Sequence, residues 1–462
     1  MPSTGYLILG AGPTGLGAAW RLHERGSTDW MLLERESYPG GLAASFTDEA
    51  GFTWDVGGHV QFSHYHYFDG VMADLLPPEG WCRHQRRSSI RLGDRLIPYP
   101  LQNHLHHLPA AVRERCEEDL RRAWANPEES ATDFRSWLIR QFGESLAHLF
   151  FIPYNEKVWA WPPERLNALW MRNRVAPVDP NRLGGTDGSA RDDARWGPNA
   201  TFAFPARGGT GAIWRACADR LPGERLGFSR TVRRIDPDRR EVALADGTIW
   251  SYRRLLTTLP LPVLLDLMGW TRDAREARDK LLHSSTHVFG IGLSGTPPPS
   301  LRGQNWIYFP GDNCPFYRVT LFSDYSPSLV PDPDRYWSLL VEVASSAYRP
   351  ENPQTLRGRV LDGLRANGFI GERSPIVTIW STTAPYGYPT PSLGRDGFLE
   401  ALHPRLEELG IASRGRFGGW KYEVSNQDHS FMQGIEWVDR QEGGPPERTY
   451  FSPDQINRPG KV

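Results

Sequence analysis

The chain has 462 residues, enough for two or three structural units and for a core that could bury a cofactor. Its 53 Lys and Arg residues balance 54 Asp and Glu residues to a net charge of −1, which argues against binding to nucleic acid or to an anionic membrane. A hydrophobic content of 39%, with 46 Gly and 39 Pro, is typical of a soluble, loop-rich globular protein without a membrane span.

Patterns for export and for metal binding are absent from the sequence. The N-terminus has no basic start, and its first apolar run leads directly into a glycine motif. We therefore predict a cytoplasmic location. The four cysteines form no CxxC pair, and the histidines have no partners at metal-ligand spacing, so we expect neither a disulfide framework nor a metal site.

A glycine motif lies between the first predicted strand and the first predicted helix. Residues 6–9 form a short apolar run, and residues 16–22 carry apolar side chains at helical spacing. Between them, Gly10, Gly12 and Gly15 form the pattern GxGxxG. Glycine permits a tight turn, close approach of the backbone to a pyrophosphate, and close packing of the helix on the strand. We predict a dinucleotide site here.

An acidic residue and two further glycine turns favour FAD over NAD. Glu34 ends the next predicted strand, where a carboxylate can accept the ribose hydroxyls of an adenosine. Gly41 follows at a place where backbone would pass close to a diphosphate or a ring. Gly58 precedes His59 on a loop that could reach an isoalloxazine face, although His59 alone is also compatible with an ordinary loop histidine.

The rest of the chain is predicted to form a helical region followed by a sheet. Helical spacing is clear in residues 110–124 and 133–142, and residues 181–193 resemble a loop. A hairpin is expected at residues 232–250 with its turn at Asp246-Gly247. Further strands are expected at Val288–Leu293, Trp306–Phe309, Tyr317–Phe322 and Trp337–Val343.

These elements predict an α/β protein with a Rossmann-like FAD-binding domain, a helical domain and a β-sheet substrate domain. The FAD-binding domain would be assembled from residues 1–100, 196–285 and 396–462. The helical substrate or lid domain would occupy residues 101–195, and the substrate sheet residues 286–395.

Several strings of residues, spread over nearly the whole chain, resemble those of a known family. They are Val56–Val60, Phe62–Tyr65, Pro153–Asn155, Lys157–Trp159, Trp196–Phe202, Phe204–Gly211, Asp312–Arg318, Gly415–Gly418 and Asn426–Met432. Together they resemble the UDP-galactopyranose mutase family, and specifically its eukaryotic-type branch.

The resemblance implies an FAD-dependent isomerase that is active when its flavin is reduced. In the family, flavin N5 attacks the anomeric carbon of the sugar nucleotide, the diphosphate leaves, and the sugar ring opens and recloses before the diphosphate returns. The implied reaction interconverts UDP-galactopyranose and UDP-galactofuranose. NADPH is the implied reductant, and a nucleotide sugar is the implied binding partner.

The resemblance also implies roles for individual residues. The diphosphate would be held by Arg174, Arg318, Tyr308, Tyr388 and Tyr422. His59, Asn426, Gln427 and Ser430 would lie at the flavin, and Asn155, Trp159, Asn199 and Asn426 would lie near the sugar. Phe62, Tyr99 and Gln102 would face the uridine, and Arg86, Ser88 and Arg416 would hold NADPH.

The nucleoside end departs from the family pattern. Leu101 stands where an aromatic residue is expected, and Ala203 stands where the family usually has a larger polar residue. A sibling mutase acting on another hexose or deoxyhexose, joined to GDP or dTDP, therefore remains an alternative. Two further alternatives are an FAD oxidoreductase of the amine-oxidase type and a flavin-binding protein without catalysis.

Overall fold

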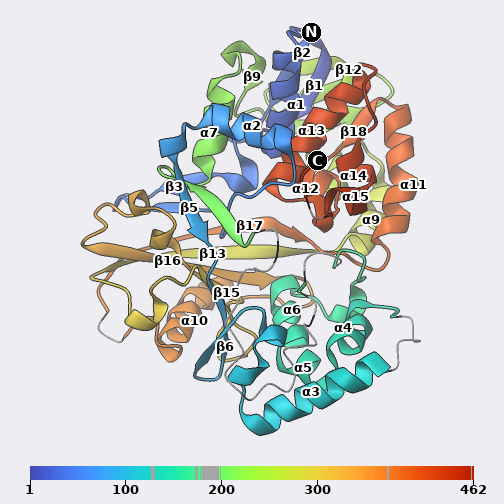
Figure 1. Cartoon of the computed structure of the whole chain (residues 1–462). Helices are drawn as coiled ribbons and strands as arrows, with labels where there is room; N and C mark the ends of the chain where they lie inside the picture. The colour runs from blue at the N-terminus through green and yellow to red at the C-terminus, as the bar shows by residue number, and fades with distance from the viewer. Residues whose placement is uncertain are drawn as a thin grey trace.

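The predicted strand–turn–helix unit is present, and its strand belongs to the first of two large sheets (Figure 1). The computed structural model describes residues 1–125, 131–171, 175–176, 178, 197, 199–371, 374–458 and 460–462. Within them, β1 (Ser3–Leu9) lies between β2 (Trp30–Leu33) and β12 (Ile249–Thr257) and pairs parallel with both. The other strands of this sheet are β9 (Leu226–Gly227), β10 (Val232–Asp236), β11 (Glu241–Leu244) and β18 (Ile411–Ser413).

The strand order is β10-β11-β12-β1-β2-β9, with β18 pairing parallel to β12. Three distant parts of the chain therefore build one sheet, as predicted for a Rossmann-like domain. The hairpin turn at Asp246-Gly247 is confirmed between β11 and β12.

Both faces of the first sheet are buried. Ile8 and Leu32 pack toward one apolar core, while Leu7, Leu9 and Leu33 pack toward the other. This alternation between two covered faces is typical of parallel sheets. The helices of this half are α1 (Pro13–Glu24), α2 (His66–Leu75), α7 (Gly211–Asp219), α8 (Leu261–Leu267), α9 (Thr271–Lys280), α11 (Arg395–Glu408), α12 (Gly415–Gly418), α13 (Gln427–Gln441), α14 (Arg448–Phe451) and α15 (Pro453–Ile456).

Helices α1 and α13 cross at a contact that only glycine allows. A Cβ atom on Gly17 would lie 2.3 Å from the carbonyl oxygen of Phe431, and one on Gly434 would lie 2.1 Å from that of Thr14. Both obstacles are backbone atoms, which cannot move aside without shifting a helix. The start of the chain and its last long helix are thereby fixed against each other.

The second sheet confirms the four strands predicted between residues 288 and 343. Its order is β17-β13-β16-β15-β14-β6-β7. The strands are β6 (Ser88–Leu92), β7 (Arg95–Pro98), β13 (His283–Ser294), β14 (Trp306–Tyr308), β15 (Arg318–Leu321), β16 (Tyr336–Ser345) and β17 (Ile376–Pro389). Residues 88–98 thus lie on this sheet, through parallel pairing of β6 with β14, although the predicted boundaries place them in the first FAD-binding segment.

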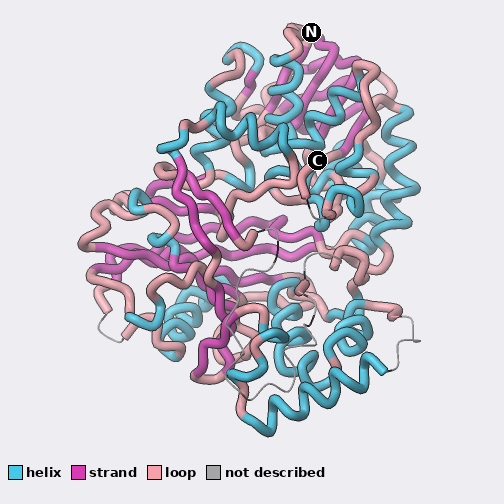
Figure 2. Tube along the Cα trace, viewed as in Figure 1, coloured by secondary structure: helices cyan, strands magenta, loops and turns pink. Residues whose placement is uncertain are grey.

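Four helices lie at the end of the molecule opposite the first sheet (Figures 1 and 2). The second sheet lies between these helices and the first sheet. They are α3 (Ala110–Ala125), α4 (Phe134–Phe142), α5 (Glu144–Leu146) and α6 (Ile152–Trp159). A capping box starts α4, because Asp133 accepts from the backbone N–H of Ser136 and the Ser136 hydroxyl lies within reach of the Asp133 N–H. A further helix, α10 (Pro353–Ala366), packs on the second sheet.

Two small two-stranded sheets complete the fold. β3 (Ser45–Thr47) pairs with β4 (Thr53–Asp55), and β5 (Trp81–Gln85) pairs with β8 (Thr201–Pro205). The loop predicted at residues 181–193 lies outside the described residues. Among the described helices, none has the length and apolar character needed to cross a membrane.

Candidate active site

A cavity of about 1740 Å³ joins the two sheets and the helical end of the molecule. Its wall contains most of the residues that sequence reasoning selected. These are Gly10, Gly12, Glu34, Gly41, Gly58, His59, Phe62, Arg86, Tyr99, Asn155, Trp159, Asn199, Tyr308, Arg318, Tyr388, Arg416, Tyr422, Asn426, Gln427 and Ser430. Gly15, Ser88 and Gln102 are not on this wall, and Arg174 lies outside the described residues.

The glycine motif forms a cradle that fits a dinucleotide diphosphate. A Cβ atom on Gly12 would meet nothing within 4 Å, so the backbone at this point of the wall is open to a ligand. Gly15 is buried behind the cradle, where a Cβ atom would lie 1.8 Å from the carbonyl oxygen of Gly10. The N-terminus of α1 follows directly, and its unpaired N–H groups favour an anion.

The second glycine turn lies against the first. Gly40 donates its N–H to the carbonyl oxygen of Ala11 at 2.8 Å, and a Cβ atom on Gly41 would lie 3.4 Å from the Cα of Gly12. Glu34 accepts from the N–H of Ala11 at 2.7 Å and remains on the cavity wall. These residues fit the diphosphate and ribose of FAD.

The start of α13 also lies on the cavity wall. Asn426 is the N-cap residue, and Ser430 lies on the wall one turn into the helix. Gln427 is held in place because its Oε1 accepts from the indole N–H of Trp214 at 2.7 Å. The positive end of this 15-residue helix therefore faces the cavity.

The turn that carries His59 packs against a buried ion pair. Gly57 has φ of +121°, and a Cβ atom on Gly58 would lie 3.2 Å from the Arg318 guanidinium. Burial, opposed by Glu342 and assisted by Arg416 and Arg318, lowers the pKa of His59 to about 4. His59 is therefore neutral at pH 7. Within the described residues, its Nδ1 is buried without a hydrogen-bond partner, which leaves it available to a ligand.

Arg318 is held by Glu342, a residue that sequence reasoning missed. The two residues face each other across β15 and β16, and the guanidinium donates from both Nε and Nη2 to the carboxylate. The Nη2–Oε1 distance is 2.8 Å. Burial would raise the pKa of Glu342, but Arg318 outweighs this effect and holds the pKa below its ordinary value. The sequence did carry a signal for this residue, because Glu342 is the single acid in the otherwise largely apolar strand 336–345.

Partly buried phenols surround Arg318. Burial raises the pKa of Tyr308 and of Tyr388, so both hydroxyls keep their protons and can donate to an anion. The ring of Tyr308 meets the rings of Tyr99 and Tyr154 edge-on, each with centroids 5.2 Å apart. Tyr154 lies on the wall and was not selected from the sequence.

Helix α6 presents an amide and an indole to the same cavity. The Asn155 side chain donates to the carbonyl oxygen of Phe151 at 2.8 Å and accepts from the indole N–H of Trp159 at 3.2 Å. The Trp159 ring meets the Tyr422 ring edge-on, with centroids 4.9 Å apart. These contacts give the wall a rigid aromatic surface suited to a sugar ring.

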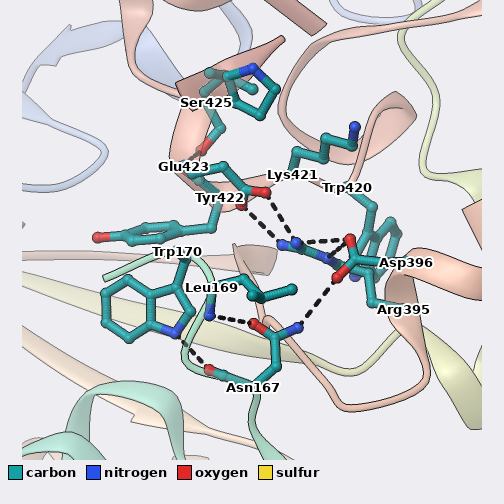
Figure 3. A network of polar contacts seen from close by, with 12 residues as sticks. Asn167, Leu169, Trp170, Arg395, Asp396, Trp420, Lys421, Tyr422, Glu423 and Ser425 are labelled. Carbon is teal, nitrogen blue, oxygen red and sulfur yellow. Dashed lines mark hydrogen bonds and ion pairs between the residues drawn. The ribbon is translucent and has the colours of Figure 1, made fainter. Parts of the chain in front are cut away.

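A buried polar network supports this aromatic wall from behind (Figure 3). Arg395 donates from both Nη atoms to Glu423 at 2.8 Å and from Nε to Asp396 at 2.9 Å. Asn167 donates to the carbonyl oxygen of Ser392 at 3.1 Å, and its own carbonyl oxygen accepts from the indole of Trp170. The network thereby joins the Trp170 segment to the segment that carries Tyr422.

The residues expected at the nucleoside and NADPH ends are only partly brought together. Arg86 donates to Asn199 Oδ1 at 2.5 Å, and its guanidinium lies 5.5 Å from the Tyr99 ring centroid. Arg416 lies on the wall but donates to the carbonyl oxygens of Gly387 and Ser425.

Ser88 and Gln102 lie behind the wall. Ser88 is buried in β6, and the Gln102 amide donates to the carbonyl oxygen of Ala176 at 2.6 Å. The 3-10 turn at Leu101–Asn103 buries Gln102, whereas Phe62 and Tyr99 remain on the wall.

Stability is expected to fall as pH rises from about 4 to 6 through Asp55, which precedes the His59 turn. Burial raises the pKa of Asp55 to about 6, while Ser45 and the Thr210 N–H bind its carboxylate. A raised carboxyl pKa means that the folded state binds the proton more tightly than the unfolded state does. Between pH 4.5 and 7.5, wild type should therefore lose about 2 kcal/mol of unfolding free energy relative to Asp55→Asn.

Urea unfolding of the two proteins at both pH values measures this difference. A stability difference that stays constant between pH 4.5 and 7.5 would contradict the assignment of the titration to Asp55.

The fold and the cradle define a flavoprotein of the amine-oxidoreductase class. Residues 13–294 match the family of flavin-containing amine oxidoreductases. Two solved structures share the fold at low identity. One is a protein of Exiguobacterium sp. 255-15, provisionally assigned as a protoporphyrinogen oxidase, with TM-score 0.71 and 16% identity over 96% of this chain and 99% of that one. The other is cyclohexylamine oxidase from Brevibacterium oxydans, with TM-score 0.65 and 14% identity over 96% and 100%.

A third structure is much more similar. A crystal structure of reduced UDP-galactopyranose mutase superposes with a TM-score of 0.95, and the chains are 45% identical over 99% of this chain and 98% of that one. The chain belongs to the UDP-galactopyranose mutase family.

Proposed function

We propose that this protein interconverts the pyranose and furanose forms of a nucleoside diphosphate hexose, with UDP-galactose as the preferred substrate. One observation carries the proposal: a single cavity joins the glycine cradle to Arg318 and its surrounding tyrosines. Such a cavity can hold a flavin and a sugar diphosphate together. The 45% identity with a UDP-galactopyranose mutase supports the same substrate class.

The residues around Arg318 would bind the leaving diphosphate. Bound FAD, when reduced, supplies the nucleophile for the anomeric carbon of the sugar. Negative charge grows on the diphosphate as its bond to the sugar breaks, and fixed donors stabilise that charge most strongly in a buried site. Arg318 supplies a permanent positive charge, whereas Tyr308 and Tyr388 supply O–H donors without adding charge.

The remaining wall residues would orient the sugar and transfer protons. Asn155 and Trp159 are fixed by hydrogen bonds along α6 and present a polar edge and a flat ring to a polyhydroxylated substrate. His59 is neutral at pH 7 and can exchange a proton with a ligand through a nitrogen. Arg174 remains a proposed diphosphate ligand by family resemblance.

We further infer NADPH as the reductant, membership of the eukaryotic-type branch, and a cytoplasmic location. Arg86 lies on the wall beside Tyr99, where a cation and an aromatic ring could receive a phosphate and a base. Arg416 contributes charge at the same cavity, although its donors already bind backbone carbonyls. The four cysteines are free thiols, a state typical of a reducing compartment.

Turnover is expected with enzyme reduced by dithionite or NADPH, and not with oxidised enzyme. The measurement is conversion of UDP-galactofuranose to UDP-galactopyranose, followed by chromatography under anaerobic conditions. Equal rates in both redox states would contradict the proposal. Rapid oxygen consumption with an amine, without binding of any sugar nucleotide, would favour the amine-oxidase alternative.

A screen of UDP-, GDP- and dTDP-sugars identifies the nucleobase. Because Gln102 lies behind the wall, we expect the base to be recognised mainly by Phe62, Tyr99 and their neighbours. A preference for a GDP- or dTDP-linked sugar would assign the protein to a sibling activity within the same family.

A further inference from the structure

Lysine is rare in this chain, and one lysine is buried beside the candidate active site. Among the 53 basic residues, only Lys157, Lys280, Lys421 and Lys461 are lysine. Lys157 is 2% exposed, and among the described residues no carboxylate lies within ion-pair distance of it. A buried ammonium group is costly unless its three protons are satisfied, so this position requires a specific explanation.

The Lys157 ammonium group binds the loop between β14 and β15. Its Nζ donates to the carbonyl oxygen of Gly311 at 2.8 Å and to that of Cys314 at 3.0 Å, and the Cys314 sulfur lies at 3.6 Å. Three acceptors thus match three protons. Burial lowers the pKa of Lys157 and raises the pKa of the Cys314 thiol, while each group opposes the shift of the other.

This loop joins the two strands that carry the wall residues Tyr308 and Arg318. Tyr308 is the last residue of β14 and Arg318 is the first residue of β15, and they face each other across the hairpin that the loop closes. Lys157 itself belongs to α6, between the wall residues Asn155 and Trp159. One side chain therefore connects the helix that faces the sugar with the hairpin that faces the diphosphate.

We propose that Lys157 is a positioning residue that holds Arg318 and Tyr308 at the correct distance from α6 for diphosphate binding. This inference rests on the proposed function, and it assigns to Lys157 a role in affinity for the diphosphate group rather than for the base or the flavin. Lys157 acts through the backbone of residues 311–314 and does not touch the cavity.

The surroundings of the loop explain why arginine does not occupy this position. The loop is held on its other side by α10, where a Cβ atom on Gly363 would lie 2.8 Å from Cys314 and from Phe316. The loop therefore cannot move away to admit a planar guanidinium group, whose donors have a fixed fork geometry. Lys157→Arg is expected to behave as a disruptive substitution in a chain that otherwise uses arginine almost throughout.

The test compares ligands with and without a diphosphate. In the FAD-loaded Lys157→Met variant, the Kd for UDP should rise about tenfold, because two buried carbonyl groups lose their donor and the loop shifts. The Kd for uridine should change less than about twofold, since the base contacts lie elsewhere. FAD absorbance and occupancy should match those of wild type.

Chemical rescue separates positioning from a general loss of stability. Ethylammonium chloride added to Lys157→Ala should restore at least about a third of the lost UDP affinity and of kcat/KM. The same salt should have no such effect on wild type or on Lys280→Ala, a variant of an exposed lysine on α9. If Lys157→Ala does not fold, the UDP and uridine comparison with Lys157→Met decides the question.

Two results would overturn the proposal. One is an equal loss of UDP and uridine affinity in Lys157→Met, and the other is a folded Lys157→Ala variant that ethylammonium does not rescue. Failure of wild type to bind UDP or to isomerise any sugar nucleotide would instead overturn the proposed function. The two failures are therefore distinguishable.

Discussion

Replacing Arg318 with alanine is expected to reduce kcat/KM by about 10³-fold or more while FAD remains bound. The Arg318 guanidinium group lies between the His59 turn and the tyrosines of the wall. Its loss removes the positive charge that would stabilise the negative charge growing on the departing diphosphate. Arg318→Lys should retain little activity, because an ammonium group cannot bind Glu342 in a bidentate manner and still present a donor to the cavity.

Arg318→Ala also leaves Glu342 as an unpaired buried acid. The resulting loss of stability needs a control of its own. Removing one partner of a buried ion pair costs about 3–5 kcal/mol of stability. In the double variant Arg318→Ala/Glu342→Gln, we expect stability to recover while turnover stays lost. Thermal unfolding and anaerobic kinetics on both variants measure the two effects. Recovery of turnover in the double variant would show that Arg318 serves only to neutralise Glu342.

Alanine at Gly15 is expected to abolish FAD retention. The new Cβ atom would lie 1.8 Å from the Gly10 carbonyl oxygen, and a backbone atom in the turn cannot move without changing the cradle. Alanine at Gly10 should have a similar effect, because that residue has φ of +106° and its Cβ atom would lie 2.1 Å from the Thr258 hydroxyl.

The matched control is Gly70→Ala in α2, where a Cβ atom would meet nothing within 4 Å. Alanine is favoured over glycine within a helix by about 1 kcal/mol, so this variant should be at least as stable as wild type. Flavin absorbance after gel filtration gives the bound fraction for all three variants. Full FAD occupancy in Gly15→Ala would contradict the cradle assigned here.

The parts of the site that depend on local sequence were predictable. The GxGxxG turn and Glu34 follow from the spacing of apolar and glycine residues within one strand–helix–strand unit. The strands of the second sheet were predictable because they are short segments rich in residues that favour β-structure. The family resemblance then added Arg318, the tyrosines and Asn155, which the structure places on one cavity wall.

Features that depend on strand register were not predictable. The Arg318–Glu342 pair exists because β15 and β16 align these two residues across an antiparallel ladder, and no local pattern fixes that alignment. The direction of a side chain in a short turn is equally hard to predict, so Gln102 was expected at the uridine and instead lies behind the wall. The support of Trp170 and Tyr422 by Arg395 likewise joins segments far apart in sequence.

The crossing of α1 and α13 has a consequence for biosynthesis. The cradle at Gly10 to Gly15 is translated long before the helix that packs against α1, because that helix begins only at Gln427. A nascent chain that has not yet reached α13 therefore carries only part of its cofactor pocket. We expect stable flavin binding only after both helices have emerged from the ribosome.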